Sequence, residues 1–232
     1  MNRRPVITID GPAGAGKSTI SRLLAERFSF IYLDTGALYR AVALRLRSQG
    51  WDGREDRLAA LCRNIRVEMR KVGDRLRVFT EGDDVTEKIR SEEIGLQASR
   101  VSAVPAVREM LLSVQREAAA GGGVVAEGRD MGSVVFPDAE VKFFLDASVE
   151  ERAKRRYLEL TAKGDAVRQR DIEEDLLLRD RQDRGRSIAP LVCPPDAVII
   201  DSTDKTISQV VDIMLSAINK SGHLCRLHNK YP

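Results

Sequence analysis

Short apolar runs alternate with segments of helical periodicity along most of the chain. Five runs are rich in β-branched or aliphatic residues and have the length of buried strands: residues 6–9, 31–33, 124–126, 141–145 and 197–200. Apolar positions recur at helical spacing in residues 17–27, 38–46, 105–119, 149–162, 172–183 and 207–218. This alternation predicts an α/β fold, with a five-stranded parallel sheet flanked by helices.

One region departs from the alternation. Ile65–Arg70 and Arg75–Phe79 resemble two polar strands, and Val72-Gly73-Asp74 supplies turn residues between them. Helical segments lie on both sides of this pair. The pattern therefore predicts a short antiparallel hairpin, inserted at the edge of the main domain.

The composition narrows the class of protein. The chain has 232 residues, of which 43% are hydrophobic and 31% charged, and its net charge is +3, so we expect one substantial core with a small insertion. We find no apolar run long enough for a membrane span and no signal peptide. The cysteines (Cys62, Cys193, Cys225) are far apart, which favours a reducing cytoplasm. Both histidines, His223 and His228, lie in a polar tail, so histidine-based catalysis is disfavoured.

The first predicted strand leads directly into a glycine-rich motif. Residues 11–18, Gly-Pro-Ala-Gly-Ala-Gly-Lys-Ser, match the phosphate-binding pattern G-x-x-x-x-G-K-[ST], and a helical segment follows. Glycines let successive N–H groups point into one concavity, and a helix N-terminus adds positive potential there. Lys17 can reach the β- and γ-phosphates, and the Ser18 hydroxyl can ligate Mg²⁺. The motif predicts a P-loop NTPase fold that binds a nucleoside triphosphate.

Four further clusters bear on the fate of the γ-phosphate. Asp34–Arg40 and Glu127–Asp130 each follow a predicted strand, where open α/β sheets bind ligands, although Asp34 or Thr35 also suits a helix cap. An acid such as Glu127 can hold Mg²⁺ through water. The arginine-rich segments Glu151–Arg156 and Arg179–Arg186 suit two helices that form a lid over phosphates, with a solvated charged face as the alternative.

Together these segments resemble the bacterial cytidylate kinases of the nucleoside monophosphate kinase superfamily. The resemblance runs from about Val6 to Ser202 and rests on residues 6–12, 33–40, 127–132 with 134–139, and 179–184. The Gly-Arg-Asp-Met-Gly segment at 128–132 discriminates best, since many kinases share the phosphate loop. The resemblance implies that ATP phosphorylates CMP or dCMP, giving ADP and CDP or dCDP. It also implies a monomer. The modest net charge and the few aromatic residues disfavour binding to nucleic acid, and the lack of a long apolar run disfavours a membrane span.

The resemblance assigns roles residue by residue. ATP would be held by Gly11, Pro12, Ala13, Gly14, Ala15, Gly16, Lys17, Ser18 and Thr19, with Ser18 also on Mg²⁺. CMP would be held by Thr35, Tyr39, Arg40, Ser99, Arg108, Arg129, Asp130, Arg179, Asp183 and Arg186, of which Ser99, Arg108 and Asp130 would read the base. The catalytic group would be Lys17, Arg129, Arg155, Arg179 and Arg186, with Arg156 as a further lid residue.

The implied domains and the remaining alternatives complete the hypothesis. Residues 1–62 and 103–220 would form the P-loop kinase core with a helical lid at about 152–186, residues 63–102 a small inserted NMP-binding subdomain, and residues 221–232 a disordered tail.

Another P-loop kinase acting on UMP or shikimate is one alternative. A regulatory module that binds ATP without transferring phosphate is the other, although it needs no second phosphate site.

Overall fold

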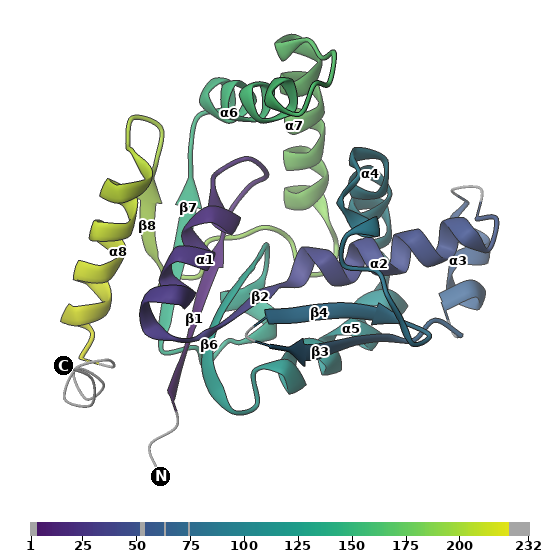
Figure 1. The fold of residues 1–232 in the computed structure, drawn as a ribbon, viewed down its shortest axis with the longest axis horizontal. Coiled ribbons are helices and arrows are strands. Elements are labelled where there is room, and N and C mark those ends of the chain that lie inside the picture. Colours follow the sequence, from purple (N-terminus) through teal and green to yellow (C-terminus); the bar gives the residue numbers. More distant parts are fainter. Residues whose placement is uncertain (1–3, 52–53, 63, 74, 223–232) are drawn as a thin grey trace. The chain divides into compact units, whose positions relative to one another are not determined.

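The computed structural model describes residues 4–51, 54–62, 64–73 and 75–222 (Figure 1). The chain divides into two compact units: unit 1 is Met1–Phe30 with Gly122–Pro232, and unit 2 is Ile31–Gly121. Unit 2 extends beyond the expected insert at 63–102, because the helices before and after the insert share one apolar core with it. The role of 63–102 in binding a nucleoside monophosphate stays a prediction. Most of the expected disordered tail, residues 223–232, lies outside the described residues.

Unit 1 contains four parallel strands that place their carboxyl ends at one edge. They are β1 (Arg4–Asp10), β6 (Gly122–Gly128), β7 (Val141–Asp146) and β8 (Val198–Asp201). In the register of the sheet, Asp10 lies opposite Gly128, so the phosphate loop and the segment after β6 leave the sheet side by side. The sheet order is β2-β6-β1-β7-β8, and β2 (Ile31–Asp34) is the first segment of unit 2. The five-stranded sheet predicted from the sequence is confirmed.

Helices flank the strands of unit 1 (Figure 1). The first helix packs on β1 and β6 and against the last helix, and the two arginine-rich helices pack on each other. A five-residue π-helix, η2, directly follows Arg129-Asp130. The bounds are α1 (Lys17–Phe28), η2 (Met131–Val135), α6 (Val149–Ala162), α7 (Gln169–Gly185) and α8 (Ile207–Lys220).

Unit 2 is built around an antiparallel sheet with the order β3-β4-β5. The predicted hairpin is confirmed, with Val67 opposite Thr80 and Val72 opposite Arg75, although Asp74 of the expected turn lies outside the described residues. Aliphatic side chains from this sheet and from the surrounding helices form one core. The bounds are α2 (Thr35–Ser48), α3 (Glu55–Cys62), β3 (Val67–Val72), β4 (Arg75–Thr80), β5 (Asp83–Asp84), η1 (Lys88–Arg90), α4 (Glu92–Val101) and α5 (Pro105–Ala118).

Two properties of the described residues bear on the cellular setting. None of their helices is both long enough and apolar enough to cross a membrane. Cys62 is buried and Cys193 is exposed, and both are free thiols.

Candidate active site

The phosphate loop lies between the end of β1 and the start of α1. Gly14 (φ 78°) and Gly16 (φ 91°) have left-handed backbone conformations, which glycine adopts without steric cost. A Cβ at Gly11 would lie 1.9 Å from the carbonyl oxygen of Leu145 on β7, so only glycine fits there. Gly16 forms the N-cap of α1 without a side-chain cap, which leaves the first N–H groups of the helix available for an anion.

The side chain of Lys17 is buried beneath this loop. Its Nζ donates to the carbonyl oxygen of Pro12 at 2.6 Å, which holds the ammonium against the loop that it would serve. Burial and, to a smaller extent, the nearby charge of Arg129 lower the pKa of Lys17 to about 7, against the opposing effect of Glu127. Lys17 therefore lies where an added negative charge would stabilise its charged form.

Three charged residues lie beside the phosphate loop: Glu127 at the end of β6, and Arg129 and Asp130 directly after it. Glu127 is buried at the end of β6, and the side chain of Asp130 is 3% exposed. Asp10, at the end of β1, accepts hydrogen bonds from the backbone N–H groups of Met131 and Gly132 at 2.8 and 2.7 Å. These contacts join the segment that carries Arg129 and Asp130 to the strand that carries the phosphate loop.

Arg129 belongs to a partly buried cluster of guanidinium groups around one buried carboxylate. Its Nε donates to Asp183 Oδ2 at 2.6 Å, and Arg186 forms a hydrogen-bonded ion pair with Asp183 Oδ1. The Asp183 side chain is 4% exposed. Burial alone would raise the pKa of Asp183, but Arg129 and Arg186 outweigh it and hold the pKa below its usual value. Asp183 is thus an ionised carboxylate that positions two arginines.

Arg179 stands close to the same cluster. Burial lowers its pKa; the charges of Arg129 and Arg156 add to this effect, and Asp175 and Asp183 oppose it. Mutual repulsion among cations is unfavourable unless an anion lies between them. Lys17 and Arg179 therefore share a lowered pKa caused mainly by burial, and a nearby anion would favour their charged forms.

The two arginine-rich helices α6 and α7 are tied to the phosphate loop by Arg152. This buried arginine donates from Nη1 to the carbonyl oxygen of Ala13 at 3.0 Å and from Nη2 to Asp180 Oδ2 at 2.7 Å. Its Nε donates to the carbonyl oxygen of Ala147 at 2.9 Å. One guanidinium group thus connects the loop, α6 and α7.

The other arginines of α6 make different contacts. Arg155 donates to the Oγ of Ser202 at 3.1 Å and to its carbonyl oxygen at 2.6 Å, and it pairs with Glu151. Arg156 pairs with Glu159 on the same helix. Arg155 is therefore anchored beside the end of β8 in this structure, and its predicted role at the phosphates would require these contacts to be exchanged.

In unit 2, the first two turns of α2 carry three of the residues predicted to bind CMP, namely Thr35, Tyr39 and Arg40. Asp34 caps the helix by accepting from the N–H of Ala37 at 3.1 Å, and Thr35 is buried at its first position. Arg40 donates from Nη1 to the carbonyl oxygens of Ile89 and Ser91 at 3.2 and 3.1 Å. The helix-cap interpretation of Asp34 is confirmed. The guanidinium group of Arg40 is held by the end of η1 and by the residue that follows it.

The predicted base-reading residues of unit 2 lie on α4 and α5. Arg108 is buried, donates to the carbonyl oxygen of Ser102 at 3.0 Å, and has its Cζ atom 5.7 Å from the centre of the Tyr39 ring. Ser99 is half-buried one turn before the end of α4, and its carbonyl oxygen accepts from the Ser102 hydroxyl. The structure thus brings Tyr39 and Arg108 into contact and connects Ser99 to Arg108 through Ser102.

Taken unit by unit, the predicted residues form two groups. The contacts and electrostatic interactions above join one group within unit 1: the phosphate loop, Lys17, Arg129, Arg179, Asp183 and Arg186. Thr35, Tyr39, Arg40, Ser99 and Arg108 form the group in unit 2. Sequence reasoning gave no role to Asp10 or Arg152. The signal at Asp10 was a carboxylate that ends an apolar strand, whereas nothing in the spacing of Arg152 distinguished it from its neighbours.

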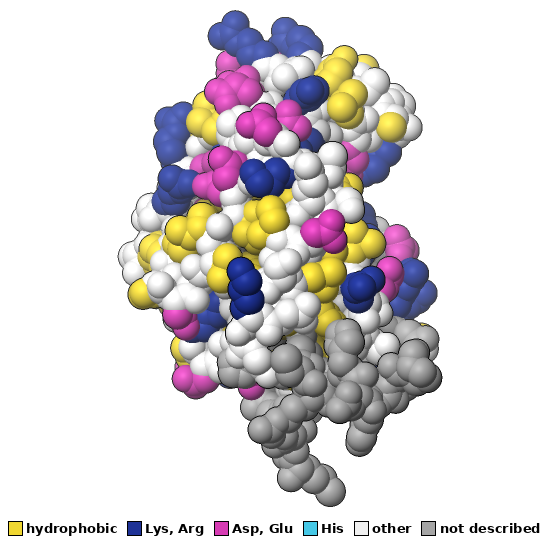
Figure 2. All heavy atoms as spheres, turned by 90° about the vertical axis from the view of Figure 1, so that its left-hand side faces the viewer, with side chains coloured by type: hydrophobic (Ala, Val, Ile, Leu, Met, Phe, Trp, Pro, Cys, Tyr) yellow, Lys and Arg dark blue, Asp and Glu magenta, His cyan; other side chains and the backbone are white. Residues whose placement is uncertain are grey.

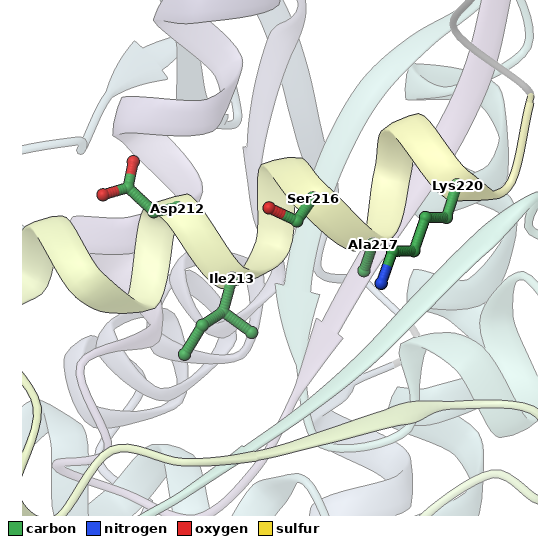
Figure 3. A pocket seen from close by; sticks show the side chains of 5 residues that line it. All are labelled: Asp212, Ile213, Ser216, Ala217 and Lys220. Atoms are coloured by element: carbon green, nitrogen blue, oxygen red, sulfur yellow. The ribbon is translucent and has the colours of Figure 1, made fainter.

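A surface hollow on α8 is separate from these groups. Figure 3 shows its lining residues, none of which belongs to the predicted site: Asp212, Ile213, Ser216, Ala217 and Lys220. Figure 2 shows one face of the molecule, on which basic and acidic side chains are interspersed with hydrophobic ones. We therefore locate the chemistry from the phosphate loop and its charged neighbours rather than from the hollow.

Comparisons with known proteins agree with this geometry. A family model described as cytidylate kinase matches residues 7–220. The cytidylate kinase of Citrifermentans bemidjiense is 51% identical over 216 residues, which cover 93% of each chain. That of Vibrio cholerae is 48% identical over 215 residues, which cover 92% of this chain and 96% of the other.

A solved structure extends the comparison to the fold. A gluconokinase from Sinorhizobium meliloti 1021 covers 99% of this chain and 100% of its own, with a TM-score of 0.50 and 14% identity, and so supports the kinase fold alone. The match over residues 7–220 and the near-complete coverage of the relatives show the family directly. The chain belongs to the cytidylate kinase family and is an ATP-dependent phosphotransferase.

Proposed function

We propose that the enzyme transfers the γ-phosphoryl group of ATP to CMP or dCMP, using the cations of unit 1 to bring two polyanions together. The observation that carries this proposal is that Lys17 donates to the phosphate loop, with Arg129 close enough to lower its pKa and Arg179 close to the same Arg129. This cluster of cations is compensated only in part by Asp183 and Glu127, since the pKa values of Lys17 and Arg179 remain lowered. It becomes favourable when a triphosphate and an acceptor phosphate supply the opposite charge.

The acceptor explains why no general base is required. A phosphate monoester has its second pKa near about 6, so at neutral pH it is already an anionic nucleophile. The barrier lies in positioning the two phosphates and in neutralising their charge. Arg129 and Arg186, held by Asp183, offer fixed donors for that purpose, and closure of α6 and α7 would exclude water and limit hydrolysis of ATP.

We assign the remaining roles by resemblance and by contact. Residues 11–19 would hold ATP, with Lys17 on its phosphates, and Arg40 and Arg129 would hold the phosphate of CMP. Tyr39, Arg179 and Asp183 would lie near the acceptor ribose, where Thr35 also contributes. The lid residues that neutralise the transferring phosphoryl group would be Arg155, Arg156, Arg179 and Arg186.

Selection of cytosine would depend on Ser99, Arg108 and Asp130. Cytosine presents an amino donor at N4 and acceptors at N3 and O2, whereas uracil carries a carbonyl at position 4. A carboxylate that accepts from N4 and a guanidinium that donates to N3 and O2 would discriminate by about 1–3 kcal/mol for each good contact. The burial of Asp130 and Arg108 supports this role, since desolvated polar groups discriminate strongly.

The donors around the phosphate loop suit Mg²⁺. Ser18 offers an exposed hydroxyl next to Lys17, and Glu127 offers a buried carboxylate at the end of the neighbouring strand β6. Both are oxygen ligands, which Mg²⁺ prefers, and Glu127 would act through water. When bound, the ion neutralises part of the charge on the triphosphate. We further propose a monomer in the cytoplasm, where both nucleotides are supplied.

An acceptor panel tests the proposal. ADP release would be measured with CMP, dCMP, UMP and AMP for the wild type and for Asp130→Ala. We expect the wild type to prefer CMP and dCMP, and we expect Asp130→Ala to lower kcat/KM for CMP far more than for UMP. Asp138→Ala, on the exposed turn after η2, should leave the ratio unchanged. Equal losses on CMP and UMP would remove Asp130 from base recognition.

A further inference from the structure

The carboxylate of Asp10 has a position that the reaction itself does not require. It ends β1, it is completely buried, and it immediately precedes the first glycine of the phosphate loop. Its Oδ1 accepts from the N–H of Met131 at 2.8 Å and its Oδ2 accepts from the N–H of Gly132 at 2.7 Å. Both oxygens of one side chain are therefore used on two successive backbone donors of another segment.

Those donors belong to the start of the π-helix η2. The first N–H groups of a helix have no partner within the helix, and the N-cap residue of η2, Asp130, makes no side-chain capping bond. Asp10 satisfies two of these groups from a different element. The segment is also tightly packed, because a Cβ added at Gly132 would lie 3.0 Å from the hydroxyl of Thr8 and 3.1 Å from both Lys142 and Pro194.

The two residues that precede Met131 are Arg129 and Asp130. Fixing the N–H groups of Met131 and Gly132 also fixes the backbone from which Asp130 extends, because consecutive residues are joined by planar peptide units. The anchor is β1, whose next residue is Gly11. A single carboxylate thereby sets the segment carrying Arg129 and Asp130 against the loop that would hold ATP.

We propose that Asp10 is a positioning residue for acceptor recognition, whose two hydrogen bonds to Met131 and Gly132 hold Asp130 where it can read cytosine. The inference rests on the proposed role of Asp130 and deepens it. It requires a group with two acceptor oxygens. An asparagine of the same shape offers one oxygen and turns an NH₂ group toward the second backbone donor.

The electrostatic setting of Asp10 supports this interpretation. Burial raises the pKa of Asp10 to about 6, while the hydrogen bonds from Gly132 and Met131 act in the opposite direction. The charge of Asp130 raises the pKa and that of Lys17 lowers it. The backbone donors thus help to keep Asp10 ionised at neutral pH, which is the form that accepts both bonds.

The experiment compares Asp10→Asn with Glu140→Gln. Glu140 Oε2 accepts from the backbone N–H of Val6 at 2.7 Å, so it is also a carboxylate bonded to a backbone donor, at the opposite end of β1. Steady-state kinetics would be measured with CMP and with UMP, together with KM for ATP and unfolding in urea. We expect Asp10→Asn to lower the ratio of kcat/KM for CMP over UMP about tenfold, with KM for ATP changed less than twofold, while Glu140→Gln keeps the wild-type ratio.

Each outcome bears on the inference. If Asp10→Asn loses stability but keeps the wild-type ratio, the role is only structural and the inference is wrong. If the wild type itself does not prefer CMP over UMP, the proposed function fails instead, and the two failures are distinguished. Should Asp10→Asn not fold, Asp10→Glu replaces it, because it keeps both acceptor oxygens but displaces them: a lowered ratio of kcat/KM for CMP over UMP supports the inference, and the wild-type ratio overturns it.

Discussion

The interiors of the two units are built on different principles. Unit 1 buries many charged side chains at and around the phosphate loop: Asp10, Lys17, Glu127, Asp130, Lys142, Arg152, Asp180 and Asp183. Among the side chains of unit 2 that the structure describes, Arg108 is the charged one that is buried, and the core around it is aliphatic. Unit 1 therefore depends on electrostatic compensation, and unit 2 depends mainly on the burial of apolar surface.

This difference follows from the chemistry assigned to each unit. Charges that stabilise a transferring phosphoryl group act most strongly where water is excluded, so unit 1 must hold them in its interior. Burying them is costly, and the ion pairs Arg129–Asp183 and Arg152–Asp180 offset that cost. The residues of unit 2 that are proposed to contact the acceptor include one buried charge, Arg108, and an otherwise aliphatic core can hold it.

The strongest test of the contrast is Lys17→Ala. We expect phosphoryl transfer to fall about a thousandfold or more, because the ammonium proposed to contact the phosphates of ATP is lost. We expect no loss of stability, since burial of this ammonium already lowers its pKa to about 7. Single-turnover transfer to CMP and unfolding in urea measure the two effects. Lys205→Ala, on the exposed segment before α8, is the control, and near-normal transfer by folded Lys17→Ala would exclude Lys17 from the mechanism.

The second test compares one ion pair from each unit. Arg129→Ala removes the partner at 2.6 Å from buried Asp183 but leaves Arg186 paired with it, so we expect a loss of about 2 kcal/mol in the free energy of unfolding. A double-mutant cycle with Asp183→Ala isolates the coupling between them. The Arg77–Asp84 pair, at 2.7 Å on the exposed hairpin of unit 2, is the matched cycle. We expect a much smaller coupling there, and comparable values in both cycles would contradict the contrast.

The sequence predicted the architecture of unit 1 better than its electrostatics. Val6–Ile9 and residues 124–126 are short aliphatic runs, and their strands follow from that pattern with small shifts at the ends. The phosphate loop was identified because a local motif determines its geometry. The partners of Asp183 and Arg152 were out of reach, because ion pairs between β6, α6 and α7 depend on how distant segments pack.

The same reasoning explains what was missed elsewhere. Helix α4 was not predicted as a separate element because its apolar positions are few and lie next to the hairpin. The π-helix η2 has no sequence periodicity that could reveal it, since five residues are too short for a pattern. Asp10 was read as the end of a strand, and only the fold shows the two N–H groups that it accepts from.

The last prediction concerns the pH dependence of stability. Asp10 has a pKa of about 6 in the folded protein and an ordinary value of 3.8, so between these values the folded state binds more protons than the unfolded state. Its contribution to stability therefore falls as the pH rises from about 4 to 6, by about 1.4 kcal/mol for each unit of pKa difference. Asp10→Asn has no carboxyl group to titrate at this position. The free energy of unfolding of the wild type minus that of Asp10→Asn should therefore fall as the pH rises from about 4 to 6.

Asp84 of unit 2 provides the opposite case. Its bonds with Thr86 and Arg77 lower the pKa of Asp84 to about 2, so its contribution is already complete above pH 4. Urea unfolding between pH 4 and 7 should therefore give parallel curves for the wild type and Asp84→Asn, and diverging curves for the wild type and Asp10→Asn. Parallel curves for both would mean that Asp10 carries no cost of burial. A diverging curve for Asp10 alone means that unit 1 keeps an unfavourable buried charge, which is the expected consequence if that charge is needed to position the acceptor-reading segment.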